Sequence, residues 1–181
     1  ALTLLDKLYI TPRQWLRILR WTMYSLLFLT ALLVQTVVLG NRTLFGTHPT
    51  FVPLVITCVC LREGAERGGL FALLASLFWC LSGADQGSLS IFTLTVVPVL
   101  GTVVCSAVLN NRFLPCLALS FLTLCCDQIL CFAVKFFLGQ MSGALFVREL
   151  IPCVFVSILC QPLIYWLVKC IAKIGASYES T

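Results

Sequence analysis

Asp127 is the residue of this sequence whose chemistry most needs an explanation. It lies inside an apolar segment, between LTLCC and QILCF, where a charge costs at least about 2.5–3.5 kcal/mol on membrane-insertion scales. Such an acid is a candidate proton site, a substrate ligand or half of a buried ion pair. It can also be structural, as an acid that faces a helix bundle and bridges helices together with Gln128 or a serine. Because no second intramembrane acid is present to form a relay, the structural role is favoured.

The 11 cysteines do not predict a metal or redox site, although their number is high for a chain of 181 residues. No CxxC pair occurs, and the single histidine, His48, lies in a loop or at the edge of an apolar segment. Zinc sites and thiol redox sites need such ligands at short, regular spacings. We therefore interpret the cysteines as reduced, small apolar side chains within the membrane. We expect no metal and no cofactor.

The other polar residues do not form a catalytic set in the sequence. A serine protease within the membrane needs a histidine in another span, and no glycine-rich phosphate-binding motif occurs. The net charge of +5 is expected at the membrane face, where it lies opposite anionic lipid. These observations predict a protein that is not an enzyme and that does not bind nucleic acid.

The composition predicts an all-α integral membrane protein. Of the 181 residues, 60% are hydrophobic and only 10% are charged, and the mean hydropathy is +1.04. Soluble domains carry about 25% charged residues. The length allows about six helices of about 20 residues that are joined by short loops, which leaves no room for a separate soluble domain.

We expect six membrane-spanning helices and two cytoplasmic termini, because this arrangement gives a strong positive-inside bias. The expected spans are residues 21–39, 44–61, 64–82, 89–109, 114–138 and 151–171. The basic residues on the cytoplasmic side are then Lys7, Arg13, Arg17, Arg20, Arg62, Arg67, Arg112, Lys169 and Lys173. Only Arg42 and Arg148 lie in the outer loops. Residues 1–20 form a basic amphipathic segment on the membrane surface, residues 21–173 form the six-helix domain, and residues 174–181 form a short cytoplasmic tail.

The second expected span is the least regular. Its purely apolar part, residues 51–61, is too short to cross about 30 Å of hydrocarbon at about 1.5 Å per residue. Pro49 and Pro53 suit a helix start and a kink in the first turn. A re-entrant segment is therefore the alternative. We favour a full span because a re-entrant segment would move several of the cytoplasmic basic residues to the outer side.

Small residues recur at every fourth position in the third expected span. They would form one ridge of a helix, made by Gly64, Gly68, Ala72, Ser76 and Cys80. In lipid, such a ridge lets a second helix approach closely. Packing against neighbouring helices of the same chain is the favoured interpretation, and a surface that binds a partner is the alternative. Gly83 and Gly87 then belong to an outer turn, where glycine can adopt positive φ.

Several sequence features along residues 49–173 occur in the same order as in the rod shape-determining protein MreD family, which this chain resembles. The matching residues are Pro49 in HPTFVPLVI, Gly68-Gly69, Gly83 and Gly87 followed by Leu89, Asp127, Pro162 in QPLIYWLVK, and Lys169. The chain departs from the family in its third span, because many members carry an acid and a further glycine there. Trp79 and Ala75 occupy the aligned positions, which puts the role of that acid in doubt.

This resemblance implies a non-enzymatic, multi-pass subunit of the cell-elongation machinery in the bacterial cytoplasmic membrane. Its expected partners are MreC and, directly or through the complex, a RodA-type glycosyltransferase and a class B penicillin-binding protein. The ridge residues Gly64, Gly68, Ala72 and Ser76 are the candidate packing face. The resemblance also implies the fold of the substrate-binding subunits of energy-coupling-factor vitamin transporters. Such a transport subunit is the alternative function, and a channel or proton-coupled carrier that rests on Asp127 is a third class.

Overall fold

The structure, a computed structural model, describes residues 12–38, 49–82, 89–108, 113–139 and 143–174. Within these ranges every regular element is helical, so the all-α prediction is confirmed for this part of the chain. The elements are α2 (Pro12–Leu33), the π-helix η1 (Val34–Val38), α3 (Val52–Glu63), α4 (Ala65–Leu81), α5 (Leu89–Val108), α6 (Phe113–Phe137) and α7 (Gly143–Ala172).

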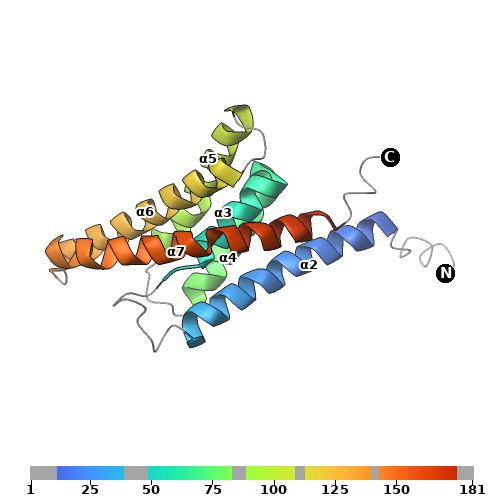
Figure 1. Ribbon diagram of the computed structural model, residues 1–181. Coiled ribbons are helices and arrows are strands. Elements are labelled where there is room, and N and C mark those ends of the chain that lie inside the picture. Colours follow the sequence, from blue (N-terminus) through green and yellow to red (C-terminus); the bar gives the residue numbers. More distant parts are fainter. Residues whose placement is uncertain (1–11, 39–48, 83–88, 109–112, 140–142, 175–181) are drawn as a thin grey trace.

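The short helix α3 lies at the centre of the bundle. It packs against α2, α4, α5, α6 and α7, which surround it (Figure 1). Each residue from Val52 to Cys60 is buried, because the sequence VPLVITCVC is apolar on all sides of the helix. A helix of this kind is stable where either lipid or other helices cover its whole circumference, and here other helices cover it. The remaining helices therefore surround α3.

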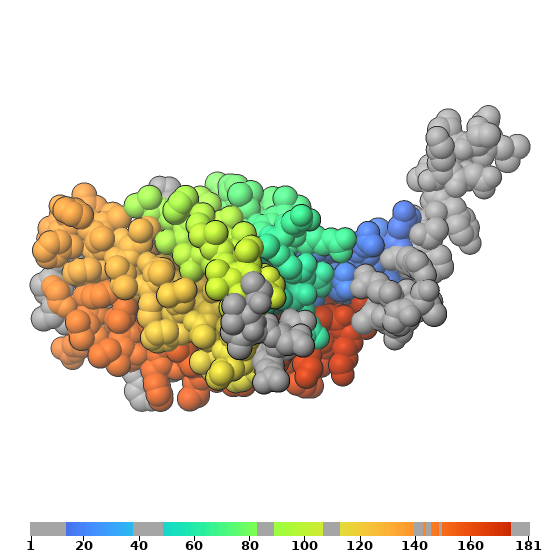
Figure 2. Space-filling view, turned by 90° about the horizontal axis from the view of Figure 1, so that it is seen from above, coloured from blue at the N-terminus to red at the C-terminus, as the bar shows by residue number. Residues whose placement is uncertain are grey.

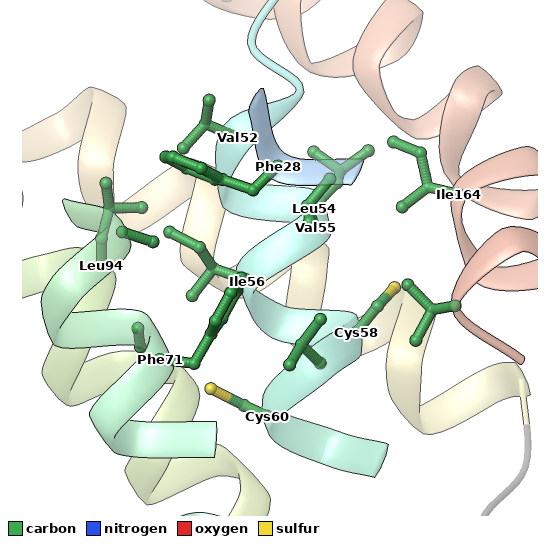
Figure 3. Packing of buried hydrophobic residues seen from close by; sticks show 14 of the residues in the cluster. Phe28, Val52, Leu54, Val55, Ile56, Cys58, Cys60, Phe71, Leu94 and Ile164 are labelled. Atoms are coloured by element: carbon green, nitrogen blue, oxygen red, sulfur yellow. The ribbon is translucent and has the colours of Figure 1, made fainter. Parts of the chain in front are cut away.

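Bulky apolar side chains from four helices converge on α3. Phe28 comes from α2, Phe71 from α4, Leu94 from α5 and Ile164 from α7, and all four are buried (Figure 3). Sequence positions as distant as 28 and 164 thus meet in one core. In lipid, such side chains stabilise the bundle through close packing rather than through removal from water.

The junction of α3 and α4 brings two helix backbones into close contact. Gly64 alone separates the two helices, and its φ of 89° lies in the left-handed region that favours glycine. One turn into α4, a Cβ atom added to Gly68 would lie 2.5 Å from Cys60 Cα. The Cys60 thiol donates a hydrogen bond to the Gly68 carbonyl over 3.1 Å. Only glycine at position 68 permits this approach of two backbones.

Among the described residues, four helical segments are long and apolar enough to cross a membrane, which indicates a multi-pass membrane protein. They are Gln14–Val37, Leu89–Ser106, Phe113–Phe137 and Phe146–Ala172. On one face of the molecule α4, α5 and α6 lie next to one another (Figure 2). Large apolar side chains of α4 are exposed on the outside of the bundle, as lipid contact requires: Leu70, Leu73, Leu74, Leu77, Phe78 and Leu81.

The other two helices are shorter than a membrane-spanning helix. With 12 and 17 residues, α3 and α4 extend about 18 and 26 Å, against about 30 Å of hydrocarbon. The expected crossing by residues 44–61 and 64–82, and the cytoplasmic position of both termini, stay predictions. Helix α2 continues through residue 20 without a break, so the expected boundary between a surface segment and a span is not marked in its backbone. Residues 1–11 and 175–181 lie outside the described ranges.

Candidate functional site

Asp127 lies on α6 and faces the interior of the bundle, where it is 0% exposed. Thr93 on α5 donates a hydrogen bond from its hydroxyl to Asp127 Oδ1 over 3.1 Å. The Ser90 hydroxyl lies beside the same carboxyl group. The second oxygen, Oδ2, has no hydrogen-bond partner among the atoms that the structure describes. The carboxyl group therefore bridges α5 and α6, and its second oxygen can still accept a hydrogen bond or bind a cation.

The first two turns of α5 position the hydroxyl groups around this acid. Ser90 and Thr93 are three residues apart, so both lie on one face of the helix, and both are buried. Phe92 between them is exposed on the opposite side. The Thr93 hydroxyl is also 3.1 Å from the Ser90 carbonyl oxygen, within reach of a second acceptor. Sequence reasoning placed Asp127 in the interior with Gln128 or a serine as its partner. Ser90 is such a serine, whereas Thr93 is a partner that it did not name.

The beginning of α3 forms a second polar contact with the surrounding helices. The N–H groups of Phe51 and Val52 donate to Gln35 Oε1 over 2.9 and 3.4 Å, and the Thr50 N–H donates to the Ser157 hydroxyl over 3.2 Å. The first turn of a helix leaves such N–H groups without partners inside the helix. The residue in the N-cap position is Phe51, which cannot supply a side-chain acceptor. The acceptor is instead the Gln35 side chain, which comes from the π-helix η1.

The Gln35 contact was missed by the sequence analysis. Short π-helical segments are frequent at functional sites, and a lone amide inside an apolar span is the one sign of such a role in the sequence. Cys153 on α7 connects this contact to the acid, because its thiol interacts with Thr50 and Ser157 through hydrogen bonds and with Asp127 electrostatically. The carboxyl group and the Val52 end of α3 thus belong to one polar region, which we call the Asp127 region.

A neutral polar cluster lies elsewhere in the core, where α3, α6 and α7 meet. Gln161 Nε2 donates to the Ser120 hydroxyl over 2.8 Å, and the Thr57 and Ser120 hydroxyls are 2.8 Å apart. Gln161 Nε2 also lies 3.2 and 3.4 Å from the thiols of Cys58 and Cys116. All 11 cysteines are free thiols, and no group of three potential metal ligands occurs among the described residues.

The structure places the small-residue ridge of the sequence analysis against neighbouring helices of this chain. Gly68, Ala72 and Ser76 are buried, and the Ser76 hydroxyl is 3.2 Å from the Thr95 hydroxyl of α5. Gly64 is the single residue that connects α3 and α4, and it is half-buried. The ridge residues therefore pack within the chain, where a partner helix cannot reach Gly68. The outer-turn candidates Gly83 and Gly87 lie outside the described residues.

An apolar groove of about 220 Å³ lies between α2, α3 and α7. The one hydroxyl in its lining belongs to Thr30, which donates to the Leu26 carbonyl over 2.7 Å. The lining is Leu27, Thr30, Ala31, Val34, Phe51, Val55, Cys160, Leu163, Ile164 and Leu167. This groove suits hydrocarbon and offers no group that would orient a polar ligand.

Comparison with known proteins finds no match: no family model fits the chain, and neither a curated protein nor a solved structure is detectably similar to it. What the protein does must therefore be argued from its own residues. The arrangement supports helix packing and the holding of one small, positively charged species in the interior.

Proposed function

We propose that this chain is a non-enzymatic, multi-pass subunit of the cell-elongation complex in the bacterial cytoplasmic membrane. It helps to maintain rod shape by organising peptidoglycan synthesis in the side wall. The observation that carries the proposal is the order of family marks along the sequence, from Pro49 through Gly68-Gly69 and Asp127 to Pro162. Six spans with both termini in the cytoplasm are part of this proposal, since they give the strongest positive-inside bias.

The arrangement of exposed surface is compatible with a membrane subunit that works through other proteins. The outer face of α4 presents a row of exposed leucines, including Leu70, Leu74 and Leu81, while its small-residue side is occupied within the chain. Helices associate in lipid through packing of such faces rather than through a hydrophobic driving force. We propose MreC as the direct partner, with a RodA-type glycosyltransferase and a class B penicillin-binding protein reached directly or through the complex.

The substrate-binding subunit of an energy-coupling-factor vitamin transporter is the second candidate. The Asp127 region favours it, because a carboxyl group, the Thr93 and Ser90 hydroxyls and the buried start of α3 converge inside the bundle. Ligand sites of membrane transporters combine interrupted helices with a few polar groups in this way. The number of such groups here is small for tight binding of a vitamin.

Affinity purification of the tagged protein from its own membranes distinguishes the two candidates. Mass spectrometry would measure both the co-purified proteins and the bound small molecules, and an unrelated multi-pass protein with the same tag is the control. Recovery of MreC or a penicillin-binding protein without a bound metabolite is the result that we expect. A stoichiometric vitamin together with a transporter ATPase would overturn the proposal in favour of the second candidate.

A further inference from the structure

The carboxyl group of Asp127 requires a positive charge that the described side chains do not supply. An ionised carboxylate that is buried without a counter-charge is strongly unfavourable. Lys135 is on the same helix but is exposed, and eight residues separate it from Asp127, which is about 12 Å along the axis. Arg148 on α7 is exposed as well. Within the described part of the chain, neutralisation is therefore left to a proton or to a bound ion.

The groups that face Asp127 from the surrounding helices are neutral. Helix α5 contributes the Ser90 and Thr93 hydroxyls. The Cys131 thiol of α6 is 3.6 Å from the Ser90 hydroxyl, and the Cys153 thiol of α7 interacts with Asp127 electrostatically. The first turns of α3, which packs against α6, are apolar apart from the Thr50 contact that precedes them. One carboxyl group among neutral oxygen and sulfur atoms matches a single positive charge. No set of three acidic, histidine or cysteine ligands occurs among the described residues to hold a divalent metal.

The hydrogen bonds around Thr93 suit a carboxyl group that changes its charge. The Thr93 hydroxyl is 3.1 Å from Asp127 Oδ1 and 3.1 Å from the Ser90 carbonyl. When the carboxyl group is ionised, Thr93 donates to it. When the carboxyl group is protonated, it can donate to Thr93, which then donates to the carbonyl of Ser90. Both states thus keep a hydrogen bond between α5 and α6, and Oδ2 remains open to an ion.

We propose that Asp127, Thr93 and Ser90 form a site for one exchangeable monovalent cation, either a proton or Na⁺. A proton forms an O–H bond at the carboxylate, which becomes a neutral acid. Na⁺ is held by the carboxylate together with the hydroxyl oxygens. Thr93 is four residues from the Leu89 end of α5, about 6 Å along the axis. Loss of the ion leaves a buried negative charge and weakens the contact between α5 and α6.

The test measures the thermal stability of the purified full chain in detergent, from mildly acidic to mildly alkaline pH. Each series is recorded with choline and again with Na⁺ as the main cation. The occupied site is the stable one, so the melting temperature of the native protein falls by several degrees as pH rises in choline. Recovery on addition of Na⁺ at alkaline pH identifies a sodium site, and the absence of recovery identifies a proton site. Neither arm involves MreC, so this proposal can fail while the proposed function stands.

Asp127→Asn carries a neutral amide of nearly the same shape, and we expect its melting temperature to respond to neither pH nor Na⁺. An Asn variant that responds as the native protein does would overturn the proposal. If that variant does not fold, a comparison of Thr93→Val with the control Ser76→Ala tests the site. Both changes remove one buried hydroxyl from the contact of α5 with a neighbouring helix. Thr93→Val displaces the pH response or weakens the Na⁺ response, and Ser76→Ala leaves both unchanged. Equal responses of these two variants would contradict the site.

Discussion

The two ends of α3 are held in different ways. At the Glu63 end, the charges are paired and two backbones touch: Arg20 Nη2 lies 3.4 Å from Glu63 Oε2, and Tyr24 donates to Glu63 Oε1 over 2.9 Å. At the Val52 end, the helix begins with an acceptor from another element, Gln35. Asp127 nearby keeps one carboxylate oxygen without a partner among the described atoms.

This difference separates a structural end of the helix from a candidate functional one. Most buried polar groups in folded proteins are hydrogen-bonded, so an exception calls for a specific reason. The close contact of Gly68 with Cys60 fixes the Glu63 end by geometry alone. The Asp127 region, in contrast, combines a charge-bearing group with hydroxyls that accept two protonation states. We therefore expect substitutions at the Glu63 end to affect stability most, and those in the Asp127 region to affect ion binding most.

The largest loss of stability is expected for Glu63→Ala. This change removes the carboxylate that Arg20 and Tyr24 share, while Arg20 stays only 7% exposed. Removing one member of a buried ion pair typically costs about 3–5 kcal/mol. Thermal unfolding in detergent measures the effect, with Glu66→Ala as the control because Glu66 is exposed on the next turn. Similar losses in both variants would show that the pair is not buried in the protein.

The next largest loss is expected for Gly68→Leu. Its Cβ would meet Cys60 Cα at 2.5 Å, so α3 and α4 must separate, and overpacking of this kind costs about 1–3 kcal/mol, here at the upper end. Gly143→Ala is the control, since nothing lies within 4 Å of an added Cβ at that position. An unchanged melting temperature in Gly68→Leu would contradict the tight junction.

A smaller loss is expected for Gln35→Leu at the Val52 end. The N–H groups of Phe51 and Val52 would lose their acceptor, and an unsatisfied buried donor costs about 1–3 kcal/mol, here at the lower end because the second bond is long. Thr36→Val is the neighbouring control, because the Thr36 hydroxyl only donates to the Leu32 carbonyl of its own helical segment. Equal melting temperatures of the two variants would show that the start of α3 is capped in another way.

The smallest loss is expected for Asp127→Asn. The amide keeps an oxygen that can accept from Thr93 and brings no charge into the core, so its cost near neutral pH is under about 1 kcal/mol. The same variant is expected to lose the response to cations altogether. Comparison with Glu63→Ala in one set of unfolding measurements tests the contrast between the two ends. A loss of stability for Asp127→Asn as large as that for Glu63→Ala would contradict the contrast between the two ends of α3.

Much of the helical framework could be predicted from hydropathy. The expected spans 64–82, 89–109 and 114–138 agree with α4, α5 and α6 to within about one residue at the ends that are described. Helix α7 begins at Gly143, two turns before the expected start at residue 151, because the mixed polarity of residues 143–150 masks a helix that continues past Pro152. Helix α2 likewise begins earlier than the span, at Pro12.

The arrangement around α3 could not be predicted, because it depends on contacts between distant residues. An apolar segment such as VPLVITCVC reads alike as a membrane span and as a helix that protein surrounds. The inward position of Asp127 follows from the cost of a charge in lipid, but its pairing with Thr93 depends on the register of α5 against α6. Gly68 was recognised as a packing residue, while its contact, Cys60 of the preceding helix, required the fold.

Depletion of this protein in the organism that encodes it, followed by imaging of cell width and length, tests the proposed function most directly. The account predicts that depleted cells widen and lose their rod shape, and that the native chain restores it. Cells that keep their dimensions, or a growth defect that an added vitamin relieves, would contradict a role in cell elongation.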